Sequence, residues 1–416
     1  MSQNFHVCFV GLNFPLTNKA SDKESIWPIA EKLSEMGVTV SIVAYKAPTQ
    51  EMTLRRKNTS IYFVAGANEF VSKEDFPQAA ALKLSEIHSN HKIDHVHSLD
   101  SPLGKLKKVI KKNRPSLSYG VQVTSMNDMF NLLLVDESIT GLLKSNLINP
   151  ILFLKNYFFK DYFTLRAAHG VFVSSPKQAL SLERYYLYPP NWIFQIPLDS
   201  YVSDLILRKK SQALLKEYNL DETTPIVATS SSMKKPDELL YLLDVFEKIA
   251  LEHPKAKFLI IGNGPYFKDI EHEVLLKALD SRVIFTKNVP KTKLPDYISL
   301  SDVFINISYA ASGFGPTIME AMAQEKIIIG SEFSPISSII EDGKNGFLIR
   351  PGETDKCANL IDEAFTGAMN TQIIGQTARE DIKKILDRDK LTENTLKAFK
   401  KINSRGLKLF SIPFFN

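Results

Sequence analysis

Short apolar segments rich in β-branched residues alternate with amphipathic helical segments along nearly the whole chain. The first set has an apolar segment at His6–Val10, apolar residues at helical spacing from Ile26 to Leu33, and a second apolar segment at Val38–Val43. A strand, a helix and a second strand in this order form a βαβ unit, in which the two strands run parallel. The sequence therefore predicts an α/β protein whose parallel sheets are covered by helices.

This alternation occurs in two series, which indicates two domains. Further strands of the first series are expected at Ile61–Val64, Asp94–His97 and Val121–Thr124. Those of the second are expected at Pro225–Ala228, Phe258–Gly262, Val283–Phe285, Val303–Ile307, Lys326–Gly330 and Phe347–Ile349. A polar, basic stretch around Arg208–Lys210 separates the two series, and 416 residues suit two or three domains. We predict two tandem doubly wound Rossmann-like domains, over residues 1–200 and 201–395, that face a ligand-binding cleft.

Composition excludes several other classes of protein. Two cysteines, Cys8 and Cys357, cannot form a disulfide framework or a cysteine zinc site, and they fit a reducing compartment. No run approaches the roughly 18 apolar residues of a transmembrane helix. The start, MSQNFHVCFVGLNFP, lacks a basic segment before its apolar run, so we expect it to form a strand and not a signal peptide.

A glycine-rich loop followed by a helix is the clearest binding motif. Gly313, Phe314 and Gly315 precede a helical segment whose first turn holds Pro316, Thr317 and Ile318. The unpaired amides and the positive end of such a helix suit a phosphate group, so this loop predicts an anion site. A second loop, Gly262-Asn263-Gly264-Pro265, follows a predicted strand. It is no dinucleotide fingerprint, because Phe267 occupies the place of the third glycine.

The segment Ser301–Gly352 resembles the donor-binding segment of family-4 retaining glycosyltransferases with the GT-B fold. The resemblance rests on Gly313-Phe314-Gly315, Glu320-Ala321-Met322-Ala323 and Asn345-Gly346, which stand in the family's order, with support from Gly262–Pro265. It implies a hexosyltransferase-type enzyme that moves a sugar from a nucleoside-diphosphate sugar to a glycan or lipid-linked acceptor in bacterial surface polysaccharide synthesis. It also implies that the C-terminal helix or tail, residues 396–416, packs back on the first domain.

The resemblance implies a set of donor-site residues. Lys235 would neutralise the leaving diphosphate, Glu320 would hold the ribose, and Ser312 would contact the sugar. The remaining donor contacts would come from Lys234, Ser231, Ser232, Gly262, Gly264, Pro265, Gly313, Phe314, Gly315, Pro316, Thr317 and Ile318. No metal and no cofactor are expected, because the lysine and the helix end supply the positive charge.

This chain departs from the family at four places. Ser312 stands where the family has the first glutamate of its Glu-x7-Glu motif, and Thr229 and Ser230 occupy the neighbourhood of an arginine. Asn127 stands in the place of a histidine in the first domain, and a glycine pair expected after the first strand is absent. Losing one charge-assisted hydrogen bond costs about 1.5–3 kcal/mol. A degenerate relative that serves as partner subunit of an active transferase is therefore the alternative, and an epimerase or hydrolase of the same fold is a third hypothesis.

The first domain is expected to bind the acceptor. Asn127, Asp128 and His97 are candidates for contacts to the sugar or acceptor, although a histidine at a strand end is more often structural. The net charge of +5 lies entirely within residues 1–200, and the segment Lys105–Arg114 combines an apolar stripe with a lysine-rich face. Such a helix suits an anionic membrane surface or simply an outer helix with a solvated basic face. The prediction is a cytoplasmic protein, with peripheral attachment to the inner face of the membrane as a further possibility and no nucleic-acid partner.

Overall fold

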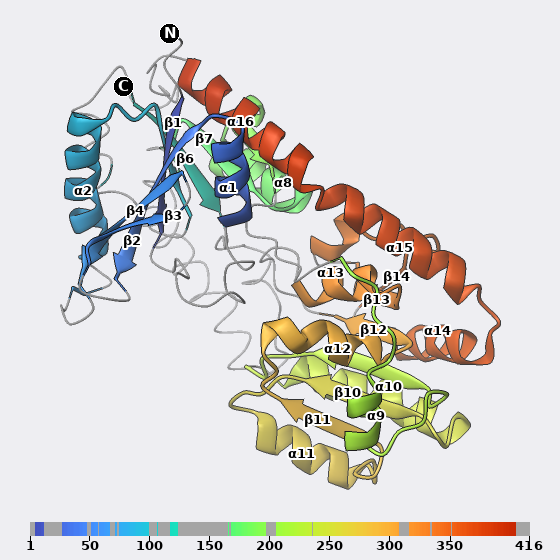
Figure 1. The fold of residues 1–416 in the computed structure, drawn as a ribbon. Coiled ribbons are helices and arrows are strands. Elements are labelled where there is room, and N and C mark those ends of the chain that lie inside the picture. The colour runs from blue at the N-terminus through green and yellow to red at the C-terminus, as the bar shows by residue number, and fades with distance from the viewer. Residues whose placement is uncertain are drawn as a thin grey trace, which may run out of the picture. The chain divides into compact units, whose positions relative to one another are not determined.

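The computed structural model describes residues 5–11, 27–47, 51–56, 58–66, 71–72, 75–99, 106, 117–123, 165, 168–196, 205–234, 236–307, 316–332, 335–350 and 352–404. These residues separate into two compact units (Figure 1). The first unit holds the described residues up to 196 together with 387–404, and the second holds those from 205 to 386. The chain thus returns to the first unit at residue 387, nine residues before the predicted start of the C-terminal segment at 396.

The first unit contains a sheet of eight strands in the order β3-β4-β2-β1-β5-β6-β7-β8. All neighbours pair in parallel except β3 and β4, which are antiparallel. The strands are β1 (His6–Gly11), β2 (Thr39–Lys46), β3 (Thr53–Arg56), β4 (Thr59–Ala65), β5 (His95–Ser98), β6 (Ser118–Val123), β7 (Gly170–Val173) and β8 (Ile193–Gln195). The described helices are α1 (Trp27–Glu35), α2 (Phe76–Asn90), α8 (Pro176–Tyr186) and α16 (Arg388–Ser404).

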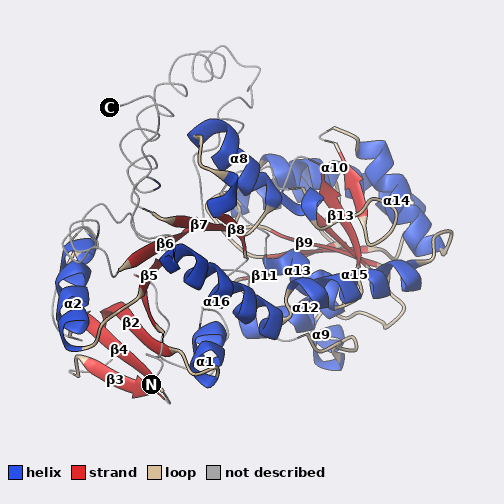
Figure 2. Cartoon of the chain, turned by 90° about the horizontal axis from the view of Figure 1, so that it is seen from above, coloured by secondary structure: helices blue, strands red, loops and turns tan. Residues whose placement is uncertain are grey.

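The C-terminal helix α16 completes the core of the first unit. It packs on α1 and on β6, although it lies more than 260 residues further along the chain than either (Figure 2). Its apolar residues Leu396, Ala398, Phe399 and Ile402 are buried in one cluster with Val7, Phe9 and Leu33. Burial of a continuous apolar stripe accounts for a helix here, because α16 is otherwise rich in lysine and polar residues.

The second unit contains six parallel strands in the order β11-β10-β9-β12-β13-β14. Its strands are β9 (Ile226–Ser230), β10 (Lys257–Ile261), β11 (Val283–Lys287), β12 (Val303–Asn306), β13 (Ile327–Ser331) and β14 (Phe347–Ile349). Its helices are α9 (Gln212–Glu217), α10 (Asp237–Glu252), α11 (Phe267–Leu276), α12 (Leu294–Ser299), α13 (Pro316–Ala323), α14 (Thr354–Thr366) and α15 (Thr371–Ile385). Two separate apolar clusters, one on each face of the sheet, bury these helices against it.

Both units confirm the predicted fold class of parallel-sheet α/β domains. Each of the six strands predicted for the second series overlaps a strand of the second sheet. The strand β3, with sequence TLRR, was not predicted, because an edge strand with polar residues has no apolar run to reveal it. Among the described residues, no helix is both long enough and apolar enough to cross a membrane.

Candidate functional site

The strand order of the second sheet has one topological switch point, between β9 and β12. The chain builds outward from β9 through β10 to β11, and it then continues on the other side of β9 through β12, β13 and β14. In such sheets, ligands bind beyond the carboxyl ends of the two strands that flank the switch point. These ends are Ser230 of β9 and Asn306 of β12.

Two side-chain hydroxyl groups hydrogen-bond the end of β9 to β12 and to α13. The hydroxyl of Thr229 donates to the carbonyl oxygen of Ile305 on β12, at 2.8 Å. The hydroxyl of Ser230 donates to the hydroxyl of Thr317, also at 2.8 Å. Because Thr317 lies in the first turn of α13, the second bond joins the end of β9 to the start of that helix. Each bond is worth about 0.5–1.5 kcal/mol.

The loop after β9 packs directly on the predicted glycine loop after β10. The backbone amide of Ser231 donates to the carbonyl of Ile261 at 2.9 Å, and the amide of Tyr266 donates to the carbonyl of Met233 at 3.1 Å. A Cβ on Gly262 would lie 2.0 Å from the carbonyl oxygen of Ser231, and a Cβ on Gly264 would lie 1.9 Å from that of Ser232. No larger residue fits at either position without moving backbone.

Gly262 also needs its backbone freedom, because its φ is +125°. Ser231 shapes the neighbouring loop: its hydroxyl accepts a hydrogen bond from the amide of Met233 at 3.0 Å. Ser232, Lys234 and Pro265 are exposed beside these loops. The structure thus brings together the predicted donor residues of the two loops.

The helix α13 places Thr317 and Glu320 one turn apart on the same side of the helix. Glu320 is 1% exposed, so it is not a solvated surface glutamate. Ile318 is fully buried in the core beneath the helix, so only its backbone amide can serve a ligand. The helix therefore offers a hydroxyl and a carboxylate near the switch point.

The other end of α13 is held by residues that the sequence did not reveal. The Arg379 guanidinium of α15 donates to the carbonyls of Ala323 and Leu205, both at 2.7 Å. The Gln324 side chain donates to the carbonyl of Ile206 and accepts from the amide of Arg208, both at 2.8 Å. These bonds join α13 to segments more than 50 residues away, and they fix the helix that carries the candidate site.

Several predicted site residues lie outside the described residues. They are Lys235, Ser312, Gly313, Phe314 and Gly315 on the donor side, Asn127 and Asp128 on the acceptor side, and the segment Lys105–Arg114 except for Leu106, which is buried. The side chain of Pro316, the first residue of α13, is also outside them.

His97 lies in the core of the first unit. It is on β5, has no exposed surface, and its ring lies among those of Phe9, Phe172 and Phe399, with centroids 5.9, 4.6 and 5.2 Å away. Neither ring nitrogen has a hydrogen-bond partner among the described residues. Burial lowers the pKa of His97 to about 3, so the ring is neutral at physiological pH. The structure does not bring His97 to a surface where an acceptor could reach it.

The match to a known family falls within the second unit. Residues 210–381 match the sequence model of a family described as "Glycosyl transferases group 1". The N-acetyl-alpha-D-glucosaminyl L-malate synthase of Bacillus anthracis is 26% identical over 210 residues, which cover 50% of this chain and 54% of that protein. The sulfoquinovosyl transferase of Arabidopsis thaliana is 27% identical over 181 residues, or 42% and 34% of the two chains. The matched region therefore spans about half or less of the length of these relatives.

The fold comparison covers nearly the whole chain. The sucrose-phosphate synthase of Thermosynechococcus elongatus superimposes with a TM-score of 0.70 at 16% identity, over 97% of this chain and 100% of that one. The Anabaena protein HepE, in complex with UDP, superimposes with a TM-score of 0.63 at 16% identity, over 95% and 100%. At this identity the likeness establishes the fold, which is that of GT-B glycosyltransferases.

Proposed function

We propose that this chain, whose residues 210–381 match the model of the group 1 glycosyl transferases and which has the GT-B fold, transfers a sugar from a nucleoside-diphosphate sugar to an acceptor. The anomeric configuration is retained, and no metal takes part. The observation that carries the proposal is the Ser230–Thr317 hydrogen bond, which joins the end of β9 to the start of α13 at the switch point of the second sheet. The loop of Ser231 follows β9, the loop of Gly262 follows β10, and Glu320 lies on α13.

In this proposal, the donor diphosphate lies at the start of α13. Backbone amides of the first helical turn and the hydroxyl of Thr317, which accepts a hydrogen bond from Ser230, donate hydrogen bonds to it, and Lys235 supplies the positive charge. The Glu320 carboxylate accepts hydrogen bonds from the ribose hydroxyls. These groups stabilise the negative charge that develops on the leaving diphosphate.

The transfer itself needs no protein base. The bond between the anomeric carbon and the diphosphate oxygen breaks, and the acceptor oxygen forms a bond to the same carbon on the same face. The acceptor proton passes to the leaving phosphate oxygen. This route agrees with the neutral, buried state of His97, which is not called upon to take the proton.

UDP is the first nucleotide to test, because the structures of HepE were solved with UDP and with UDP-glucose. The acceptor is a glycan or a lipid-linked sugar held by the first unit. The basic segment Lys105–Arg114 would attach the protein peripherally to the inner face of the membrane in the cytoplasm.

The experiment is a turnover assay on the full chain without added metal. Release of nucleoside diphosphate is followed for UDP-glucose, UDP-N-acetylglucosamine, GDP-mannose and ADP-glucose, each with and without a bacterial glycolipid extract. We expect one donor to be consumed faster with the extract, and the NMR coupling of the anomeric proton in the product to show retention. Consumption at the same rate without an acceptor would indicate a hydrolase or epimerase and contradict the proposal.

A second candidate function rests on the two serines that replace charged residues of the family. Ser230 and Ser312 leave the donor site with fewer charges, which favours a partner subunit that binds but does not turn over the donor. Nucleotide binding without turnover of any of the four donors, in the presence of the extract, would favour this candidate.

A further inference from the structure

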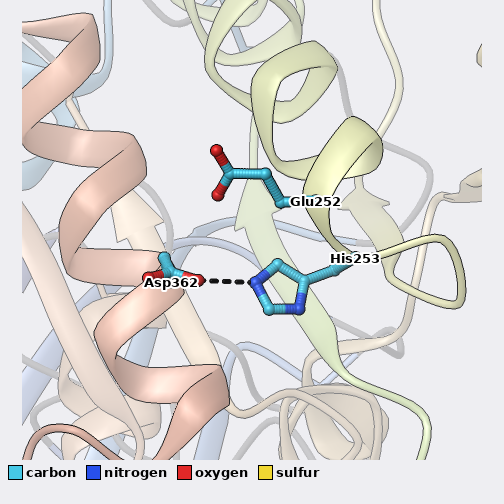
Figure 3. A group of neighbouring side chains, drawn as sticks. All are labelled: Glu252, His253 and Asp362. Carbon is cyan, nitrogen blue, oxygen red and sulfur yellow. Dashed lines mark hydrogen bonds and ion pairs between the residues drawn. The ribbon is translucent and has the colours of Figure 1, made fainter.

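A histidine and two carboxylates come together on the second unit, away from the candidate donor site. Glu252 is the last residue of α10, His253 follows it directly, and Asp362 lies on α14 (Figure 3). His253 Nε2 is 2.8 Å from Asp362 Oδ1, and the side chains are 18% and 39% exposed. One carboxylate oxygen of Glu252 completes the group, in which the three candidate ligand atoms all lie within 4.8 Å of one another.

The geometry suits a small divalent metal ion. Zinc binds imidazole nitrogen and carboxylate oxygen at about 2.0–2.2 Å, so two ligand atoms of a tetrahedral site lie about 3.4 Å apart. The His253–Asp362 pair, at 2.8 Å, would widen slightly around an ion, and the Glu252 oxygen, within 4.8 Å of both atoms, would move closer. Two carboxylates also match the charge of the ion, and water can take the remaining position. The imidazole favours zinc and similar ions over magnesium and calcium, which prefer oxygen ligands.

The fold holds His253, the central ligand of the three, in place. The backbone amide of His253 donates to the carbonyl of Ile249 at 2.8 Å, and its ring meets the edge of Phe365, with centroids 5.3 Å apart. The guanidinium of Arg282 donates to the carbonyl of Ala250 at 2.8 Å and fixes the end of α10. Ligands that are ordered before binding lose less entropy when the ion arrives, so a usable affinity needs no rearrangement of either helix.

We infer that Glu252, His253 and Asp362 form a site for a divalent transition metal of the zinc type, which joins α10 to α14. The ion would replace the proton that His253 and Asp362 share. The first turn of α10 lies beside the loop of Lys234, and the cluster lies at the other end of this 16-residue helix, about 24 Å away. At that distance the ion cannot contact the donor, so its role is structural. The site is independent of the proposed transfer reaction.

The test uses the full chain after treatment with EDTA. Zn²⁺ is titrated while thermal unfolding is followed, and Co²⁺ is titrated while visible absorption is followed. We expect Zn²⁺ to raise the midpoint of unfolding in a saturable way, and Co²⁺ to give a saturable absorption band with one ion per chain. An ion that binds only the folded state must produce such a shift.

Substitutions at the cluster test whether the ion binds there. His253→Gln and Glu252→Gln should weaken binding at least tenfold, and His272→Gln, an exposed histidine on α11, should leave it unchanged. The readout is the shift that zinc produces within each variant, so a variant that is less stable without metal still gives a result. Two results would overturn the inference: no saturable shift in the unsubstituted chain up to 1 mM Zn²⁺, or an undiminished shift in His253→Gln. A dissociation constant of 1 mM corresponds to a binding free energy of only about −4 kcal/mol.

Discussion

The strands at the switch points of the two sheets hold their polar side chains in different surroundings. In the second sheet, Thr229 and Ser230 end a strand at the switch point, and both hydroxyls are hydrogen-bonded. In the first sheet, β5 lies at the corresponding switch point beside β1, and its His95 and His97 are fully buried. In the second unit these polar side chains are hydrogen-bonded to the neighbouring elements β12 and α13, whereas in the first unit the histidine rings are buried among aromatic rings.

The difference comes from the helix that covers the first sheet. Phe399 of α16 stacks on the ring of His95, with centroids 4.3 Å apart, and also contacts the rings of His97 and Phe172. The second unit has short hydroxyl side chains at the end of β9, and their partners lie on β12 and α13. The elements that cover a strand therefore determine the surroundings of its polar side chains.

The largest expected effect is a loss of stability on substituting a residue of α16, the helix that covers the first sheet. Phe399→Ala removes a fully buried ring, and we expect a loss of about 3–5 kcal/mol in the free energy of unfolding. Urea unfolding measures this loss. Nucleotide affinity of the folded variant should stay unchanged, since the donor elements belong to the second unit. A loss below about 1 kcal/mol would contradict the assigned packing.

The second effect is a loss of stability in acid. Burial lowers the pKa of His97 to about 3 in the folded chain, while the unfolded value is 6.5. The unfolded state then binds more protons between these values, so stability is fully present above pH 6.5 and is lost as the pH falls toward 3. From pH 6.5 to pH 5, His97 alone should cost about 2 kcal/mol.

His97→Phe tests this assignment, because phenylalanine keeps a ring of similar size but takes up no proton. Urea unfolding at pH 5, 6 and 7 should show a smaller dependence on pH for the variant than for the unsubstituted chain. The same slope in both would mean that His97 is not buried and neutral.

The third effect concerns the contact between the two loops of the second unit. Gly264→Ala places a Cβ 1.9 Å from the carbonyl of Ser232, so the loops must separate and nucleotide affinity should fall ten- to a hundredfold. That fall corresponds to about 1.4–2.7 kcal/mol. Gly343→Ala is the matched control: its φ is +77° but nothing lies within 4 Å, so it should cost stability and leave affinity unchanged. Calorimetry that finds equal affinities for both variants would refute the role of this contact.

The smallest effect concerns the bond between β9 and α13. Ser230→Ala should lower the free energy of unfolding by about 1 kcal/mol and weaken nucleotide binding up to tenfold. A double-mutant cycle with Thr317→Val measures the coupling between the two hydroxyls. Strictly additive effects of the two substitutions would show that the hydroxyls do not act together.

Much of the fold follows from local patterns in the sequence. Buried parallel strands such as the one predicted at Phe258–Gly262 have apolar runs, and the alternation of these runs with helical segments predicts parallel sheets. The contacts that fix the site do not follow in the same way. Arg379 reaches Ala323 over 56 positions, and α16 covers His97 from almost 300 residues further along. No local pattern encodes such pairings.

The candidate site was predictable only in part for the same reason. Glycines at 262 and 264 and the carboxylate of Glu320 stand out as a motif, and the structure gives both glycines a steric reason. The environment of His97 depends on which helix covers its strand, and nothing near residue 97 reveals that helix. Its proposed role as an acceptor contact accordingly finds no support in the position of its ring.

The most direct test of the central claim is calorimetric titration of the full chain with UDP, GDP and ADP at fixed salt and without metal. We predict that one nucleotide binds with a dissociation constant in the micromolar range, about −8 kcal/mol, and that Glu320→Gln weakens its binding at least tenfold. Because Glu320 is buried, the Glu320→Gln variant must first be shown to unfold at the same midpoint as the unsubstituted chain, so that a loss of binding is not a loss of folding. Absence of binding by all three nucleotides, or equal affinity in Glu320→Gln, would contradict the assignment of this edge of the second sheet as a donor site.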